Sequence, residues 1–392
     1  MDFSRVELDA DDQAFAVELR AFLRAHVTDE VIRRDRETGE NFDEGVHLAL
    51  GAAGYLAADW RAGVDGGFSA VRRRIWELEV GRAHTPWFHW GTTALVAKFV
   101  ARFAGEEVRH EVLPGVLSGE IRLCLGYTEP EGGSDVATCK TRAVRDGADG
   151  SAWVINGAKM FTSNAHNSRY VFLLTNTDPG GLKHHNLTLF LVPLNTPGIE
   201  IQGLRTVDGD RTNIVYYSDV RVDDRYRIGE VNGGWTVMRE ALNAEHGVTA
   251  ADTAGLQNIA VMTEHALLTA EAVDSVAAAT VTAADGSVQY RLGRSAARIE
   301  AALSTPGMFG RVAIAQAMRD IAPELMDVLG AAAALPVETT GAAGGGVAEY
   351  VFRLAGPTGV YGGTLEVFRN MIAQHALGLG RPAPASPRSP VR

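Results

Sequence analysis

The period of the hydrophobic pattern changes twice along this chain, and these changes limit the folds it can adopt more than any other feature. Up to about residue 120, apolar side chains recur at helical spacing, most clearly in Asp11–Ala25, Ala70–Gly81 and Thr92–Phe103. From Ile121 to Val222, short apolar runs between turn residues predict strands at 121–125, 153–155, 170–175, 186–192, 199–204 and 212–217. Helical spacing returns after residue 234. We therefore expect helices at both ends and a β unit between them.

The predicted domains follow these changes and make the fold class α+β. They are an N-terminal α-helical domain over 1–120, a middle β domain over 121–230, a C-terminal α-helical bundle over 231–380 and a flexible tail over 381–392. The tail is predicted from its prolines, which cannot continue a helix, and a second mobile loop is expected over 336–346 because it is rich in glycine.

Composition narrows the function classes. The formal net charge is −11 and the pI is near 5.5, so nucleic acid or an anionic membrane would be repelled. A CoA ester is anionic too and would need local Lys or Arg. The two cysteines, Cys124 and Cys139, are both expected in strands as small core residues, which fits a reduced, cytoplasmic setting. No apolar run of membrane-spanning length and no secretion signal occur, and no metal site is predicted.

One stretch of the predicted β unit combines a strand with a loop that could hold a ligand. The run Ile121–Leu125 closes at Pro130, and the turn Gly132-Gly133-Ser134-Asp135 offers backbone N–H groups and a hydroxyl that can hold phosphate oxygens. The same residues are favoured in ordinary turns for backbone reasons alone. By itself the loop leaves both interpretations open.

A carboxylate lies on the apolar face of the first helix after the β unit. Trp235, Met238, Leu242, Glu245 and Thr249 follow one another at spacings of three, four, three and four, so they share one side. An ionised carboxylate that faces a core costs on the order of several kcal/mol unless it is paired or titrates. Glu245 could therefore meet an Arg or a helix N-terminus, or it could be functional.

Three segments in this order resemble the acyl-CoA dehydrogenase family. Its patterns T-E-P-x-A-G-S-D, N-G-x-K-x-W-I-T-N and [E/G]-G-T-x-[E/Q]-x-x-R-N-x-I-A correspond to residues 128–135, 156–164 and 362–373. The resemblance covers about residues 1–380. It implies an N-terminal α-helical domain, a β-barrel-like middle domain and a C-terminal four-helix bundle. It also implies FAD-dependent α,β-dehydrogenation of an acyl-CoA thioester, with electron-transfer flavoprotein as electron acceptor.

The resemblance also assigns the catalytic base. Most members carry the base Glu immediately before the Gly-Thr of the third segment, where this chain has Gly362. In the isovaleryl and long-chain branches it comes from the helix that here contains Glu245, so Glu245 is predicted to take the α-proton. The family commonly has Arg after this Glu, and this chain has His246. The backbone N–H of Gly362 is predicted to polarise the thioester carbonyl.

Cofactor contacts carry over in the same way. The resemblance places Tyr127 and Thr128 at the flavin pyrimidine edge and Gly133 and Ser134 at the pyrophosphate. Phe161 and Ser163, where the family has Trp and Thr, are expected beside the isoalloxazine face and N5, and Thr364 and Glu366 beside the adenosine part of FAD. No G-x-G-x-x-G opens a helix after a strand, so Rossmann-type binding is not supported.

Two segments of the homotetrameric members are missing. These members use R-x-x-F-G and Q-x-x-G-G-x-G in the C-terminal helices to complete a neighbour's FAD site, whereas Phe309 has no Arg three residues before it and residues 339–346 replace the second segment. The chain thus resembles the base-bearing subunit of the actinobacterial sterol side-chain acyl-CoA dehydrogenases, which are α2β2 assemblies. A second acyl-CoA dehydrogenase-like subunit is the implied partner and a steroid side-chain or other bulky acyl-CoA the implied substrate.

Two other functions stay open at this point. The missing FAD segments and His246 also suit a structural partner subunit without chemistry of its own. A CoA-ester binding protein or flavin-independent lyase on the same scaffold is a third possibility. The acyl group cannot be read from the residues, because the depth of its pocket depends on helix packing.

Overall fold

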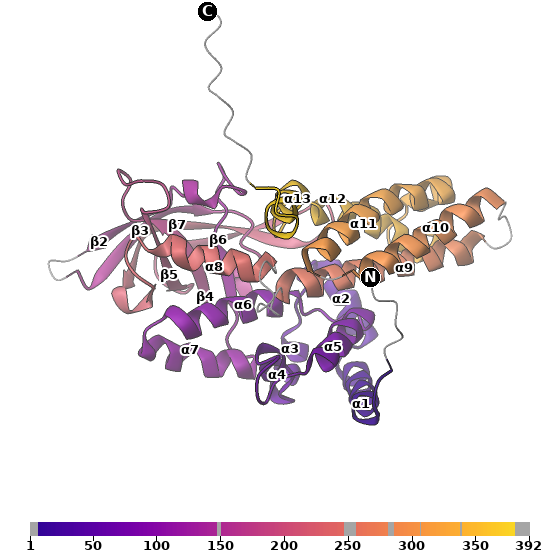
Figure 1. Cartoon of the computed structure of the whole chain (residues 1–392), viewed down its shortest axis with the longest axis horizontal. Helices are drawn as coiled ribbons and strands as arrows, with labels where there is room; N and C mark the ends of the chain where they lie inside the picture. The colour runs from indigo at the N-terminus through magenta and orange to yellow at the C-terminus, as the bar shows by residue number, and fades with distance from the viewer. Residues whose placement is uncertain are drawn as a thin grey trace, which may run out of the picture.

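The computed structural model of the chain describes residues 7–146, 150–246, 256–280, 286–305, 307–337 and 339–380. Helices come first, strands follow and helices return, which confirms the predicted fold class (Figure 1). The β unit lies at one end of the molecule, the N-terminal helices lie below it, and the C-terminal helices extend to the other end. The predicted tail and Thr249 lie outside the described residues.

The N-terminal part is helical throughout. Its helices are α1 (Ala10–His26), α2 (Asp29–Thr38), α3 (Glu44–Ala52), α4 (Tyr55–Trp60), α5 (Ala70–Arg82), α6 (Phe88–Phe103) and α7 (Glu106–Ser118). Asp9, Thr28, Asp43 and Ser69 each accept a hydrogen bond from a backbone N–H in the first turn of the helix that follows, which satisfies one donor that the helix itself cannot. The three helical segments predicted from periodicity fall in α1, α5 and α6.

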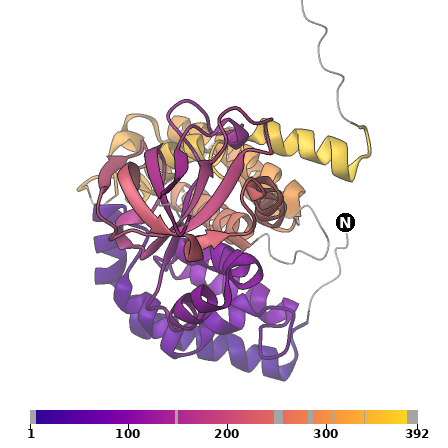
Figure 2. The ribbon, with the colours of Figure 1, turned by 90° about the vertical axis from the view of Figure 1, so that its left-hand side faces the viewer.

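The strands form one sheet, eight-stranded in the described part of the chain. They are β1 (Leu123–Gly126), β2 (Arg142–Asp146), β3 (Ala152–Lys159), β4 (Tyr170–Asn176), β5 (Leu187–Pro193), β6 (Ile199–Arg205), β7 (Arg211–Asp223) and β8 (Arg227–Ile228). The order is β6-β7-β3-β2-β4-β5-β8, with β1 paired to β4. Figure 2 shows this sheet facing the viewer above the N-terminal helices.

The sheet is loosely joined at its centre, which decides where its surface is hollowed. β2 and β4 pair through the single register position Arg142–Asn176, whereas β4 and β5 pair along their whole length. That one position is where β2 and β4 pair in the described residues. Within the described ranges the pairing path ends at β6 and β8.

The sequence misplaced one cysteine. Both cysteines are buried and free, as expected, and Cys124 lies in β1. Cys139 instead follows a short 3-10 turn over Val136–Thr138, so its prediction as a strand residue is wrong. Its thiol lies 3.2 Å from Glu129 Oε1, a polar contact that no local sequence pattern predicts.

The C-terminal helices form a bundle with a core of its own. They are α8 (Gly234–His246), α9 (Leu256–Thr280), α10 (Gly286–Leu303), α11 (Gly307–Leu329), α12 (Val347–Thr358) and α13 (Leu365–Met371). Apolar side chains of α9, α10, α11 and α12 make one buried cluster, while those of α8 belong to the cluster shared by the N-terminal helices and the sheet. The C-terminal bundle meets the N-terminal helices where α9 packs against α5 and α6. Part of the predicted mobile loop is ordered as a 3-10 turn, Ala343–Gly346.

Candidate active site

Close packing against the sheet fixes the helix that carries Glu245. A Cβ on Gly234 would lie 2.7 Å from the carbonyl oxygen of Leu187 in β5, so only glycine allows α8 to start this close to the strand. Val237, Met238, Ala241 and Ala244 are then buried in the core of the sheet and N-terminal helices. Of the predicted apolar stripe, Met238 is fully buried, whereas Trp235 and Leu242 are partly buried.

Glu245 lies at the end of this helix and is 8% exposed. Burial raises the pKa of its carboxyl to about 7, and the positive charge of Arg311 on α11 acts in the opposite direction. The carboxyl thus titrates near neutral pH, which is the range in which a carboxylate can serve as a general base.

Arg311 is itself buried, at 3% exposed, and its pKa is lowered mainly by burial. One terminal nitrogen donates to the carbonyl oxygen of Tyr361 at 2.9 Å and lies 3.4 Å from that of Gly363. The guanidinium carbon is 5.3 Å from the centroid of the Phe368 ring. The structure therefore connects α11 with the Gly362 loop through one side chain, which the sequence did not single out.

Tyr127 also faces Glu245. Its hydroxyl is buried, and among the described residues it has no hydrogen-bond partner. Burial and the charge of Glu245 both raise the pKa of this phenol, so it stays protonated at neutral pH. Glu245 thus acts electrostatically on Tyr127, and Arg311, which acts on Glu245, contacts the loop of Gly362.

The loop after β3 has the backbone strain typical of a ligand site. Phe161 and Asn164 have φ of 55° and 62°, values that residues with a side chain seldom adopt. Phe161 is 54% exposed although it is large and apolar. Ser163 lies beside β7, with its hydroxyl 3.0 Å from that of Thr212. An aromatic face is thus held outward on a strained loop.

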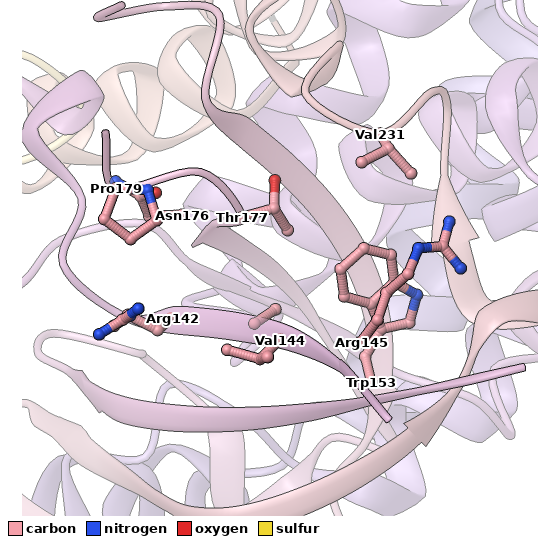
Figure 3. A pocket seen from close by; sticks show the side chains of 9 residues that line it. Arg142, Val144, Arg145, Trp153, Asn176, Thr177, Pro179 and Val231 are labelled. Atoms are coloured by element: carbon pink, nitrogen blue, oxygen red, sulfur yellow. The ribbon is translucent and has the colours of Figure 1, made fainter. Parts of the chain in front are cut away.

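Two hollows are lined by residues of β2 and β4, with volumes of about 350 and 490 Å³. Figure 3 shows Arg142 and Arg145 on opposite sides of the smaller one, with Val144 between them and Asn176 and Thr177 above. The larger is lined by Lys140, Arg142 and Lys183, among others. Lys183 pairs with Asp135 at 2.5 Å, so the larger hollow adjoins the Gly132–Asp135 turn. Within the described chain, Lys140 and Arg142 form no ion pair, and they give an acidic protein a local cationic surface.

Comparisons with known proteins agree with this arrangement. The profile of the acyl-CoA dehydrogenase N-terminal domain matches residues 9–120, and that of the middle domain matches residues 124–224. The chain is 30% identical to acyl-CoA dehydrogenase FadE26 of Mycobacterium tuberculosis, over 96% of this chain and 99% of that protein. It belongs to the acyl-CoA dehydrogenase family. It is also 34% identical to acyl-CoA dehydrogenase IpdE1 of Mycolicibacterium smegmatis, over 86% and 87% of the two chains. A 31% identical match to FadE29 of Mycobacterium tuberculosis spans 61% of this chain and 62% of that protein.

Solved structures of the family superpose along nearly the whole chain. The structure titled Tcur3481-Tcur3483 steroid ACAD has a TM-score of 0.82 and 30% identity, covering 97% of this chain and all of that one. The ChsE4-ChsE5 complex from Mycobacterium tuberculosis has a TM-score of 0.76 and 28% identity, with the same coverage. Both titles name assemblies of two different proteins.

The residues of this acyl-CoA dehydrogenase chain fit a flavin dinucleotide in the β unit. Gly133 and Ser134 are exposed, and in the described structure their N–H groups have no acceptor, so they are available to phosphate oxygens. The carbonyl of Thr128 accepts from the N–H of Met160 at 2.9 Å, which joins the first loop to the loop of Phe161. The predicted pyrimidine, pyrophosphate and isoalloxazine residues are thus adjacent parts of one surface.

Thr364 and Glu366 lie elsewhere, on the first turn of α13. The Thr364 hydroxyl caps this helix by accepting from the N–H of Val367, and Glu366 is exposed. Because α13 packs against α11, these two residues belong to the helical bundle and not to the β unit. Sequence reasoning missed Arg311, Lys140 and Arg142. A count of basic residues near the Gly-rich turn would have found only the last two.

Proposed function

We propose that this chain is the base-bearing subunit of an FAD-dependent acyl-CoA dehydrogenase that works with a second, related subunit. The observation that carries the proposal is Glu245, a buried carboxyl whose pKa is raised to about 7 and which feels the charge of Arg311, the residue that holds the Gly362 loop. It stands where the isovaleryl and long-chain branches, which this chain resembles here, carry their base.

In the proposed reaction Glu245 takes the α-proton of an acyl-CoA thioester. The electron pair of the broken C–H bond forms the α,β double bond as the β-hydrogen departs as hydride. Bound FAD would supply the acceptor for that hydride. As the α-proton leaves, negative charge grows on the thioester oxygen, and a backbone N–H at Gly362 would stabilise it. Tyr127 is protonated at neutral pH, because burial and the charge of Glu245 raise the pKa of its phenol.

The protein would bind its substrate through the phosphorylated nucleotide of CoA. Lys140, Arg142 and Lys183 surround the larger hollow and could neutralise its phosphates, which the overall negative charge of the protein would otherwise repel. Gly133 and Ser134 remain assigned to the FAD pyrophosphate, beside this hollow.

The partner and substrate class are inferred from relatives. Structures titled as a steroid ACAD and as the ChsE4-ChsE5 complex are each built from two different chains. This supports a mixed assembly, proposed as α2β2, and a steroid side-chain or other bulky acyl-CoA substrate. Electron-transfer flavoprotein as the electron acceptor and the cytoplasm as the location are proposed from the family resemblance. In the described residues no helix is long and apolar enough to cross a bilayer.

One alternative has an observation in its favour. No Arg stands three residues before Phe309, where R-x-x-F-G has one, and Gly362 stands where most members carry the base Glu. Both features are expected for a subunit that only supports its partner. The two functions differ in whether Glu245 is needed for turnover.

The test is Glu245→Gln in the complex with its partner chain. Glutamine keeps the shape but cannot accept a proton, so we expect turnover to fall by about three or more decades while flavin absorbance stays unchanged. Glu240→Gln is the matched control, because Glu240 lies on the same helix and pairs with exposed Arg102. Near-normal turnover in Glu245→Gln would favour the supporting subunit.

A further inference from the structure

The loop between α12 and α13 is fixed at two points. Its backbone is held by Arg311, which donates to the Tyr361 carbonyl at 2.9 Å. The Tyr361 side chain is held by α9, because its hydroxyl lies 3.2 Å from the ring nitrogens of buried His265. His265 also lies 3.2 Å from the hydroxyl of Thr358, at the end of α12. A loop of two left-handed glycines, Gly362 and Gly363, would otherwise have wide conformational freedom.

The contact with the Tyr361 carbonyl determines where the next N–H points. The carbonyl of Tyr361 and the N–H of Gly362 belong to one planar trans peptide, so they point in opposite directions. A donor on the carbonyl therefore fixes the N–H on the far side, and the second contact of Arg311, to the Gly363 carbonyl, limits rotation of the following peptide.

Arg311 is suited to this role and is poorly explained by folding alone. It is 3% exposed, and among the described residues its Nε has no hydrogen-bond partner. Burying a guanidinium is costly, and an apolar side chain of the same size would fill the space without that cost.

We propose that Arg311 is the positioning residue of the active site: it aims the Gly362 N–H at the thioester oxygen and supplies the positive charge opposite Glu245. The inference rests on the proposed function. It adds a residue that has two separable effects, one through geometry and one through charge.

Arg311 is the charged group that acts on the Glu245 carboxyl, and three titratable side chains lie near the same pair in the described residues. Burial lowers the pKa of His265 on α9 to about 3, so its ring is neutral at ordinary pH. The pKa values of Tyr127 and Tyr361 are raised by burial, so both phenols are neutral as well. Of these groups only Glu245 and Arg311 carry charge at neutral pH, and removing the cation must raise the pKa of the carboxyl.

Two substitutions separate the effects, and both are made in the FAD-loaded complex with the partner chain. Arg311→Lys keeps the charge but removes the guanidinium nitrogen that contacts the carbonyls of Tyr361 and Gly363. We expect kcat to fall about tenfold or more, with the ascending limb of its pH profile unmoved. Arg311→Met removes both the charge and the carbonyl contacts. We therefore expect kcat to fall further and the ascending limb of its pH profile to move upward by about one pH unit.

A binding measurement reports the geometry without turnover. Dissociation constants are compared for a CoA thioester that has no β-hydrogen and for its thioether counterpart, which has no carbonyl. In wild type the thioester should bind more tightly, and in both Arg311 variants the ratio should shrink about tenfold. Arg294→Met, an exposed arginine on α10 that pairs with Glu324, is the control and should change neither quantity.

The outcomes are distinguishable. If Glu245→Gln keeps normal turnover, the proposed function itself is wrong. If that variant is inactive but Arg311→Lys retains wild-type kcat and binding ratio, only the role of Arg311 is wrong. Should Arg311→Met fail to fold, Arg311→Lys alone decides, since a purely structural arginine would lower thermal stability without changing the ratio.

Discussion

Lys159 and Glu129 form an ion pair in the interior of the β unit, with Nζ 2.8 Å from Oε1. Lys159 is fully buried, and its ammonium also donates to the Tyr127 carbonyl at 3.2 Å. Glu129 accepts from the N–H groups of Lys140 and Thr141 at 2.6 and 2.8 Å. The pair therefore joins the start of the proposed flavin loop to β3 and to the residues that begin the cationic hollow.

Removing one member of this pair should destabilise the fold strongly. Lys159→Met leaves a buried carboxylate without its cation, and such losses cost about 3–5 kcal/mol. Urea unfolding should show this decrease for Lys159→Met, and the double variant with Glu129→Gln should lose less than the sum of the single changes. Strict additivity would show that the two side chains do not stabilise each other.

Acid should weaken the same contact. Burial raises the pKa of Glu129, but Lys159 and the hydrogen bonds from Thr141 outweigh it, so the pKa falls from 4.5 to about 2. A carboxyl whose pKa is lower when folded contributes stability above its unfolded pKa and loses it as pH falls. The difference in unfolding free energy between wild type and Glu129→Gln should therefore be full above about pH 4.5 and shrink towards pH 2. A constant difference over that range would contradict this assignment.

The pKa of Glu245 is raised, whereas that of Glu129 is lowered, and the raised value predicts how turnover depends on pH. At a pKa of about 7, the Glu245 carboxyl becomes a base only as pH rises through that value. The kcat of the complex should rise about tenfold per unit below pH 7 and level off above it. A profile that is flat from pH 5.5 to 8 would mean that a different group takes the proton.

The cationic hollow predicts an effect on substrate binding alone. Arg142→Gln and Lys140→Gln each remove a charge that could face a CoA phosphate, so KM for the CoA ester should rise about tenfold while kcat changes little. The effect should weaken at high salt, because screening reduces what each charge contributes. Arg221→Gln is the control, since Arg221 is exposed and pairs with Asp146 on the same sheet. Equal KM values in all three variants would place the nucleotide elsewhere.

Features with a local sequence pattern could be predicted, whereas contacts between residues far apart in the sequence could not. Glu245 was singled out because it is a carboxylate on an apolar helical face, and the family resemblance then assigned it as the base. β2 was missed because Arg142–Asp146 has only two apolar residues, and its pattern of burial has a single inward position. Arg311 was missed for another reason: its carbonyl partners lie about fifty residues later, and no spacing rule links an arginine on one helix to a loop after the next. The same holds for Lys159 and Glu129, thirty residues apart.

The last prediction concerns the cofactor and the partner. In the homotetrameric relatives each subunit supplies an Arg and a Gly-rich segment to its neighbour's FAD, and this chain has neither, although α11 starts at the corresponding place with Phe309 48% exposed. A symmetric assembly would leave the pyrophosphate partly unneutralised. One lost charge-assisted contact is worth about 1.5–3 kcal/mol, or roughly ten- to more than a hundredfold in affinity.

Expressed alone, the chain should therefore lose most flavin during purification, and a homologous partner chain should restore it to two FAD per four chains. Native mass measurement combined with flavin absorbance gives both the assembly and the stoichiometry. The control is the same purification with a partner whose corresponding Arg is changed to Gln, which should release flavin again. A yellow homotetramer with one FAD per subunit would contradict the mixed assembly, because it would show that this chain completes its own neighbour's site.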